Sequence, residues 1–407
     1  MSQAEPHTAE TGPNTKPAGW NSSVPPNGFH NRVPEDSAYS NDNPLGLATE
    51  VGQVDIETTP EHRNLVSGDP RCAGWVRAYD DPNVNALRDR LRQRNGIAGL
   101  ELIDPGDVER ATETFHRDGF VAIGNVLSTE QLDLLRSGVE DVTNVLLEAD
   151  PDGSVGGGAG GLPHRYSFGG TSASRHMFHR PEWSQLIDLP ATTAILTSIF
   201  GSADYIVYGS GGELVLPGAI EYQGLHSDNV WTELHDPHGS VSMRDLPTPV
   251  IHINFPTVDL TPINGPTRIL PGSHRSRSPI PKLADEPEWM RLSTVCPVPA
   301  GSAVIRDARC WHGGTPNLSR QIRALPNIEY MAPWFRSEAL LKSMSRETWS
   351  TLSPHAQRLS RYIVRDAGEP VVGEGINHPR RAERERIRDE QLAAMSDEQA
   401  ASYMQRT

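Results

Sequence analysis

The spacing of apolar residues divides the chain into four segments. Residues 1–60 hold many Pro, Asn, Ser and Thr but few large apolar side chains. Such a segment buries too little surface to offset the entropy of ordering it, so we expect it to be disordered or to lie as a strap on the main body. Residues 61–106 are predicted to be a linker with one short helix over 82–93. The main body is predicted at 107–335, followed by a charged helical extension at 336–407.

The main body opens with signals for a helix, a strand and a second helix. Residues 107–118 place their apolar side chains on one helical face, and residues 119–127 are β-rich. Ser128 and Gln131 then stand at the spacing of a capping box, and the apolar residues after them recur at helical intervals. We therefore expect a helix–strand–helix entrance to the main body.

After residue 204, short apolar runs alternate with turn residues. The runs cover residues 205–208, 213–216, 250–255, 267–270, 302–306 and 324–331. Many short strands separated by Gly, Pro and Asn predict a mainly β architecture, a sandwich or a barrel, with flanking helices. The Gly-rich stretch 152–170 has no periodicity, so we expect a mobile loop there rather than a nucleotide-binding turn.

Composition and charge exclude several classes of protein. The chain of 407 residues has 52 acidic and 37 basic side chains, a net charge of −15 that disfavours nucleic acids and anionic membranes. It contains no apolar run long enough for a transmembrane helix, and we expect no signal peptide. Cys72, Cys296 and Cys310 are far apart and are expected to be buried or free thiols. We therefore expect a soluble, cytoplasmic protein.

Two histidines and one carboxylate carry the candidate chemistry. His226 and Asp228 are two positions apart, so on an extended strand their side chains point to the same face. His312 follows the predicted strand 302–306, and Arg323 lies on the next one. Two histidines with one carboxylate leave three positions of an octahedral Fe(II) open, as in non-heme Fe(II) oxygenases. Two of these positions can hold a 2-oxo acid and the third dioxygen, while a guanidinium suits the far carboxylate of the oxo acid.

The segment Asn264–Arg275, with the sequence NGPTRILPGSHR, resembles the hairpin signature of the phytanoyl-CoA dioxygenase family. The resemblance covers residues 107–335 and includes the order and spacing of His226, Asp228, His312 and Arg323. It implies a double-stranded β-helix, a jelly roll of the cupin type. It also implies that His226, Asp228 and His312 bind Fe(II) and that Arg323 anchors the distal carboxylate of 2-oxoglutarate. Because Asp228 is present, halogenation, for which related enzymes lack this carboxylate, is not expected.

The implied reaction consumes 2-oxoglutarate and O2, releases succinate and CO2, and oxidises a C–H bond of a small organic substrate. Hydroxylation is the first expectation, and desaturation, epoxidation or ring formation in specialised metabolism are alternatives. A different class, a non-oxidative metal-dependent cupin acting as hydrolase or isomerase, would leave Arg323 without a purpose. A binding protein without catalysis would not need to retain all of His226, Asp228, His312 and Arg323. A homodimer is left open.

Further residues are weaker candidates. Asn254 and Thr267 lie on predicted barrel strands and could hydrogen-bond 2-oxoglutarate, and Trp231 could pack on the oxo acid or the substrate. Surface or hydrogen-bonding roles are expected for His235, His238 and His252, and a structural role for His274. Cations cluster after the Gly-rich stretch, so we predict that residues 152–180 form a lid. Within it, an anionic or polar substrate group would be bound by Arg165, Arg175 and His176.

Overall fold

The computed structural model describes residues 82–150, 153, 162, 164–169, 176–228, 238, 241–335, 342 and 344–365. The predicted N-terminal extension 1–60 lies outside these residues, as do Cys72, Arg175 and Trp231. Most of the predicted lid and most of the C-terminal extension also lie outside them.

The entrance to the main body is confirmed as predicted. Helix α4 (Val108–Asp118) is capped by Asp107 and ends at Gly119, whose φ of 82° is readily adopted only by glycine. Strand β2 (Phe120–Ile123) follows, and helix α5 (Thr129–Ala149) opens with the capping box of Ser128 and Gln131. Local sequence signals therefore mark both ends of α4 and the start of α5, whereas β2 is shorter than the predicted 119–127.

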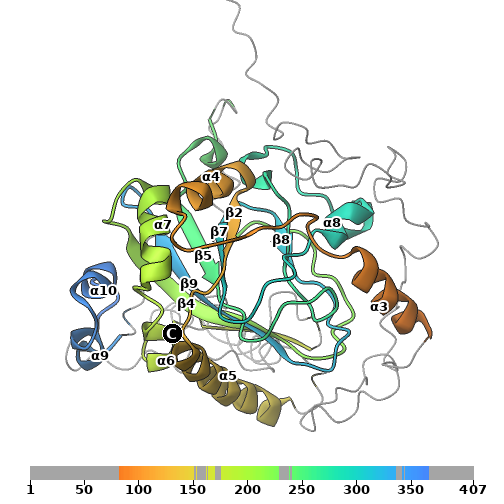
Figure 1. Cartoon of the computed structure of the whole chain (residues 1–407), viewed down its shortest axis with the longest axis horizontal. Helices are drawn as coiled ribbons and strands as arrows, with labels where there is room; N and C mark the ends of the chain where they lie inside the picture. The colour runs from red at the N-terminus through yellow and green to blue at the C-terminus, as the bar shows by residue number, and fades with distance from the viewer. Residues whose placement is uncertain are drawn as a thin grey trace, which may run out of the picture.

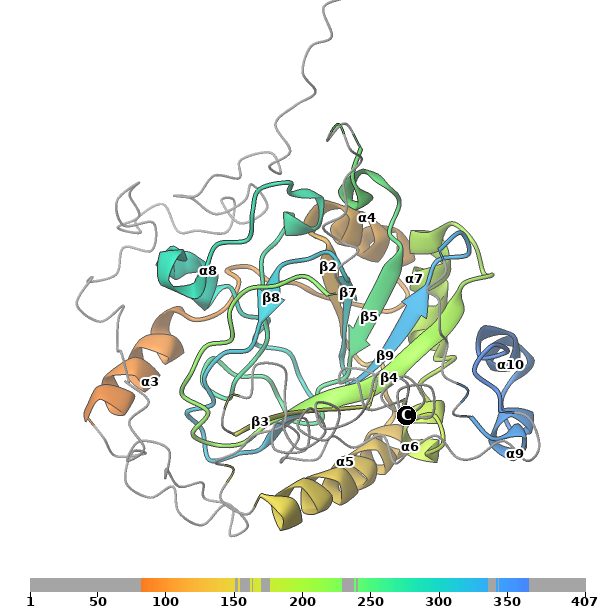
Figure 2. The same cartoon turned by 180° about the vertical axis from the view of Figure 1, so that it is seen from behind.

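Two sheets form the body of the protein, in agreement with the predicted mainly β jelly roll. The larger sheet has seven strands in the order β1-β2-β7-β5-β9-β4-β3, in which only β1 and β2 are parallel. Its remaining strands are β1 (Leu102–Ile103), β3 (Arg165–Gly169), β4 (Ile206–Val215), β5 (Val250–Asn254), β7 (Ala303–Asp307) and β9 (Arg323–Met331). A two-stranded sheet pairs β6 (Arg268–Ile269) with β8 (His312–Gly313). Figures 1 and 2 show β8 across the interior from the large sheet.

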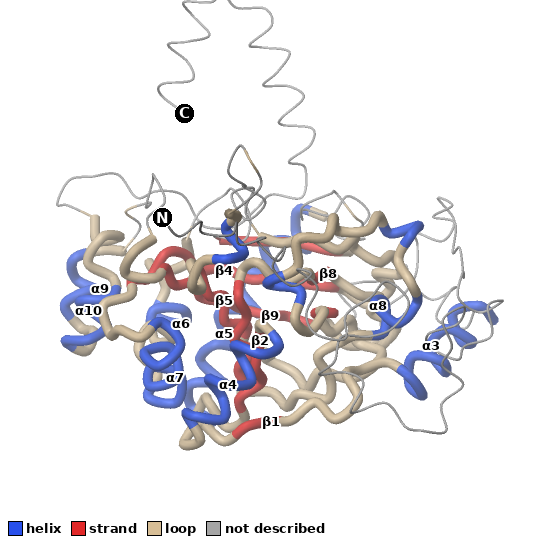
Figure 3. Tube along the Cα trace, turned by 90° about the horizontal axis from the view of Figure 1, so that it is seen from above, coloured by secondary structure: helices blue, strands red, loops and turns tan. Residues whose placement is uncertain are grey.

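Helices cover the outer face of the large sheet. These are α4, α5, α6 (Pro181–Ser184) and α7 (Pro190–Phe200), with α9 (Arg346–Ser350) and α10 (Pro354–Leu359) beyond them. Figure 3 shows this helical layer on one side, while α3 (Pro82–Arg94) and α8 (Glu288–Leu292) lie on the other. The short 3-10 helices are η4 (Met243–Asp245), η5 (Ser273–Arg275) and η6 (Leu283–Asp285). Among the described residues, no helix is both long and apolar enough to cross a membrane.

The body of the fold is larger than the predicted range 107–335. Strand β1 precedes residue 107 and pairs with β2. In the helix predicted for 82–93 and found as α3, the Arg88 side chain donates to the carbonyl of Leu318 at 3.0 Å. At the other end, Ser353 and His355 both bind the Asp188 carboxylate. Residues 82–106 are therefore part of the packed domain and not a linker, and residues 344–365 are attached to it.

The sheet also differs from the prediction near its β3 edge. The predicted strands 205–208 and 213–216 are one strand, β4, and the predicted loop 152–170 contains β3. Glycines inside β4 suggested a turn, but they serve close packing. A Cβ on Gly212 would lie 2.5 Å from the Phe168 ring, and one on Gly209 would lie 2.5 Å from Glu329 Oε2. Glycine is required at these positions because neighbouring side chains occupy the space above the strand.

Candidate active site

His226, Asp228 and His312 come together on the inner side of the fold. His226 and His312 form an antiparallel bridge through two backbone hydrogen bonds of 3.0 and 2.9 Å, and the Asp228 N–H donates to the carbonyl of Ala308. One candidate ligand atom from each side chain lies within 4.8 Å of the other two. The two imidazole centroids are 4.3 Å apart, and His312 Nε2 is 3.5 Å from Asp228 Oδ1. The predicted residues are thus brought together by backbone pairing of distant segments.

Backbone carbonyls orient both imidazoles. Nδ1 of His226 lies 3.1 Å from the carbonyl of Gly224, and Nδ1 of His312 lies 3.0 Å from that of Cys310. A carbonyl only accepts, so Nδ1 of His226 carries the proton and its Nε2 keeps the lone pair through which a histidine binds a metal ion. Nδ1 of His312 also lies 3.2 Å from NH1 of Arg306, a group that only donates, so the Cys310 carbonyl orients this ring without fixing its tautomer. Two imidazole nitrogens and a carboxylate oxygen in one small region fit a divalent first-row cation such as Fe(II).

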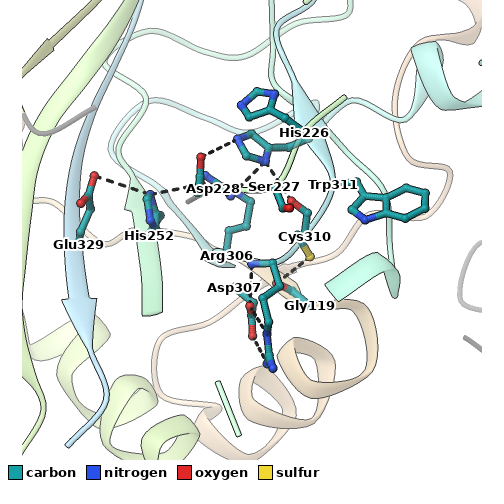
Figure 4. A network of polar contacts seen from close by, with 12 residues as sticks. Gly119, His226, Ser227, Asp228, His252, Arg306, Asp307, Cys310, Trp311 and Glu329 are labelled. Atoms are coloured by element: carbon teal, nitrogen blue, oxygen red, sulfur yellow. Dashed lines mark hydrogen bonds and ion pairs between the residues drawn. The ribbon is translucent and has the colours of Figure 1, made fainter. Parts of the chain in front are cut away.

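The charges around Asp228 keep it ionised. Burial opposes ionisation, but Arg306, with smaller contributions from three histidines, holds the pKa of Asp228 well below its usual range. The NH1 group of Arg306 donates to Asp228 Oδ2 at 2.7 Å (Figure 4). Burial and Arg306 also hold the pKa of His312 well below its usual range, so its imidazole is neutral. Both groups are therefore in the protonation state that metal binding requires.

Arg323 is a buried cation whose hydrogen-bond donors are only partly paired among the described residues. Its side chain is fully buried, and Nε donates to the carbonyl of Gly265 at 2.7 Å. Neither NH1 nor NH2 has a hydrogen-bond partner among the described residues. Burial lowers the pKa of Arg323 to about 10, an effect opposed by Glu213 and increased by Arg165. Since buried guanidinium groups are normally paired, two free N–H ends fit an anionic ligand such as a carboxylate.

A polar cavity of about 200 Å³ lies beside the three residues. Two of the weaker candidates, Asn254 and Thr267, line it. Every described lining residue is polar or charged, namely Ser167, Glu213, Gln223, His226, Ser227, Asp228, His252, Asn254, Thr267, Arg306, His312 and Asn327. Such a lining suits a polar occupant such as a dicarboxylate better than an aliphatic chain.

The predicted lid residues lie elsewhere than expected. Arg165 begins β3, is 7 % exposed, and donates from NH2 to the carbonyls of Glu221 and Thr315. Burial lowers its pKa to about 10. His176 is also buried, which lowers its pKa to about 4. The prediction of a mobile loop is wrong for Arg165, because all five residues of β3 pair with β4.

Several residues of the site were not predicted. Arg306 contacts Asp228, and Asn327, Gln223 and Glu213 line the cavity. The sequence does mark Arg306, because it is a charged residue in the otherwise apolar run of β7. Side chains alternate between the two faces of a strand, and this position faces the interior. His252 was given a surface or hydrogen-bonding role, but it is buried, with Nδ1 3.6 Å from Asp228 Oδ2 and 3.8 Å from Glu329 Oε1.

Structural similarity to known enzymes is limited. The chain matches AviO1 from Streptomyces viridochromogenes Tue57 with 22 % identity and a TM-score of 0.39, over 57 % of this chain and 98 % of that one. The non-heme alpha ketoglutarate dependent carbocyclase SnoK from nogalamycin biosynthesis matches with 20 % identity and a TM-score of 0.40, over 68 % and 98 % of the two chains. The epimerase SnoN, in complex with Fe3+, alpha ketoglutarate and nogalamycin RO, matches with 20 % identity and a TM-score of 0.40, over 56 % and 84 %.

A sequence model of a protein family also matches the chain. The sequence model of phytanoyl-CoA dioxygenase matches residues 115–325, just over half of the chain. The matched range contains the two histidines, the carboxylate and the buried arginine described above. The chain is therefore a member of the phytanoyl-CoA dioxygenase family, whose enzymes use Fe(II), 2-oxoglutarate and O2.

Proposed function

We propose that this enzyme hydroxylates a C–H bond of a small organic substrate, with Fe(II) held by His226, Asp228 and His312. In the overall reaction one oxygen atom of O2 enters the product and the other enters succinate, as 2-oxoglutarate loses CO2. The observation that carries the proposal is the pairing of two features. One ring nitrogen from each histidine and one carboxylate oxygen converge beside a polar cavity, and the buried guanidinium of Arg323 has no partner for NH1 and NH2 among the described residues.

The side chains have separate tasks in this reaction. The bound iron, with its co-substrate, supplies an oxidant able to attack an unactivated C–H bond. Arg323 binds the distal carboxylate of 2-oxoglutarate through NH1 and NH2, which have no partner among the described residues. Asn254 and Thr267 line the cavity and orient the oxo acid by hydrogen bonds. The carbonyl of Gly224 keeps His226 in the metal-binding tautomer, and the carbonyl of Cys310 orients the ring of His312.

Arg165 supports the co-substrate end of the site rather than the substrate end. Its charge acts on Arg323, and it borders a small space shared with Glu213 and Gln223. A bound carboxylate would offset the repulsion between the guanidinium groups of Arg165 and Arg323.

The test is a spectroscopic titration without oxygen. Adding 2-oxoglutarate to the Fe(II)-loaded protein is expected to produce a weak visible charge-transfer band. Arg323→Met should shift the titration to higher 2-oxoglutarate, and His312→Ala should remove the band at any concentration. A wild-type protein that binds Fe(II) but gives no band would contradict the proposal and favour a non-oxidative cupin.

The reaction type is tested next. After O2 is admitted, the wild type should convert 2-oxoglutarate to succinate slowly even without substrate, and the right substrate should accelerate this conversion. With ¹⁸O2, hydroxylation places one labelled atom in the product, whereas desaturation or ring closure places none. An unlabelled oxidised product formed together with succinate would replace hydroxylation by one of those alternatives.

A further inference from the structure

A row of buried polar side chains crosses the inner face of the large sheet and reaches Asp228. Cross-strand pairing places Gly209 of β4 opposite Glu329 of β9, Glu329 opposite His252 of β5, and His252 opposite Arg306 of β7. Glu329, His252 and Arg306 are each no more than 6 % exposed. Figure 4 shows the dashed contacts that lead from Glu329 through His252 to Asp228, with Arg306 beside them.

The two carboxylate oxygens of Asp228 have different contacts. Oδ1 faces the histidines, at 3.5 Å from His312 Nε2. Oδ2 accepts a hydrogen bond of 2.7 Å from Arg306 NH1, and the same NH1 group lies 3.2 Å from His312 Nδ1. His252 Nδ1 is 3.6 Å from Oδ2. The contact of Arg306 with Oδ2 is a charge-assisted hydrogen bond, whereas that of His252 is too long for a hydrogen bond. Arg306 is therefore the group that occupies Oδ2.

Arg306 is fixed in this position. Its strand pairs with β2 on one side and β5 on the other, so the backbone cannot move without breaking the sheet. The guanidinium is poorly placed to strengthen metal binding, because a cation beside the carboxylate repels a divalent ion. Keeping Asp228 ionised needs only a nearby positive charge, whereas control over which carboxylate oxygen is free uses the direct hydrogen bond to Oδ2.

We propose that Arg306 is a positioning residue that keeps Asp228 a one-oxygen ligand and so keeps a coordination position open. The inference rests on the proposed metal site. Carboxylates bind metal ions through one oxygen or both. Two histidines and a one-oxygen carboxylate leave three positions of an octahedral ion for the oxo acid and dioxygen. A second oxygen from Asp228 would fill one of these, and 2-oxoglutarate and O2 could no longer bind together.

The number of open positions can be counted with Mn(II) alone. Water molecules on a bound Mn(II) ion exchange with the solvent and enhance proton relaxation in proportion to their number. Arg306→Met removes the donor to Oδ2, and the proton relaxivity of the Mn(II)-loaded protein should then fall by about a third, from three waters to two. Mn(II) affinity should stay equal or rise, because a nearby positive charge has been removed. Arg306→Leu is the replacement if Arg306→Met does not fold.

Two further variants separate positioning from general damage. Arg306→Lys retains a charged donor and should keep the relaxivity of the wild type. Arg309→Lys alters a buried arginine of the same segment whose partner is Asp307, and it should also leave the relaxivity unchanged. Equal relaxivity of Arg306→Met and the wild type would overturn the inference while leaving the metal site intact. A wild type that binds no Mn(II) would instead overturn the proposed metal site itself.

Discussion

Two buried arginines near the site, Arg309 and Arg323, differ in how their guanidinium groups are satisfied. Arg309 is fully partnered, because Nε and NH2 donate to the Asp307 carboxylate and NH1 donates to the carbonyls of Met243 and Leu246. Arg323 donates only from Nε, to Gly265, and its NH1 and NH2 have no partner among the described residues. Both side chains are at most 2 % exposed.

We infer from this difference that the charge of Arg309 contributes to stability and that the charge of Arg323 contributes to ligand binding. A buried cation with a full set of acceptors adds to the folded state only if every partner stays in place. A buried cation with free donors costs free energy in the folded protein, and a ligand that pairs with it recovers this cost. Disruption near Arg309 should therefore affect folding, and disruption near Arg323 should affect binding.

The largest effect is expected at the three metal ligands. His226→Ala, Asp228→Ala or His312→Ala each removes one donor from a set of three, so succinate formation should fall to background. The midpoint of thermal unfolding of the metal-free protein should change little for the two histidine variants, since their rings border a cavity. Succinate formation near the wild-type rate in any of the three would remove the iron assignment.

Asp307→Ala should give the largest loss of stability. It leaves the Arg309 guanidinium buried without its carboxylate, a change that costs about 3–5 kcal/mol in other buried pairs. The free energy of unfolding measured in urea should fall by this amount. The KM for 2-oxoglutarate of the folded protein should remain that of the wild type, because Asp307 does not line the cavity. A changed KM with unchanged stability would reverse the roles assigned to the two arginines.

Arg323→Met tests whether this arginine serves ligand binding rather than stability. Loss of a charge-assisted pair with the distal carboxylate costs about 1.5–3 kcal/mol, which corresponds to a roughly ten- to hundredfold higher KM for 2-oxoglutarate. The stability of the unliganded protein should be equal or greater, because an incompletely paired charge has been removed from the interior. Arg323→Lys keeps a charge without the two-pronged geometry and should give an intermediate KM.

Local signals in the sequence account for much of this fold and for part of the site. Both ends of α4 and the start of α5 follow from Asp107, Gly119 and the capping box at Ser128, because caps act over three or four residues. His226 and Asp228 were recognisable because their spacing fixes their relative direction on an extended chain.

The partners that sequence analysis missed depend on contacts between distant segments. Arg306 meets Asp228 across 78 positions of sequence, and no local pattern specifies that contact. For Arg165 a weak signal existed: in β3 the apolar Tyr166 and Phe168 alternate with Arg165 and Ser167, and the polar pair borders the cavities. The alternation spans only five residues beside a Gly-rich stretch, and glycines within β4 concealed its partner strand.

The smallest predicted effect is the pH dependence that the Asp307–Arg309 pair adds to stability. Burial opposes ionisation of Asp307, but Arg309 overcomes it and lowers the pKa of Asp307 to about 2. In the unfolded chain the carboxyl has its ordinary pKa of about 3.9, so the unfolded state binds a proton more readily. The stabilisation is therefore complete above about pH 5 and is lost as the pH falls toward 2, by about 2–3 kcal/mol in total. Urea unfolding at pH 5 and pH 3 should show about 1 kcal/mol of this loss in the wild type and a shallower dependence in Asp307→Asn, which cannot titrate. Equal slopes in the two proteins would mean that other carboxylates carry the acid sensitivity and that the pair contributes little to it.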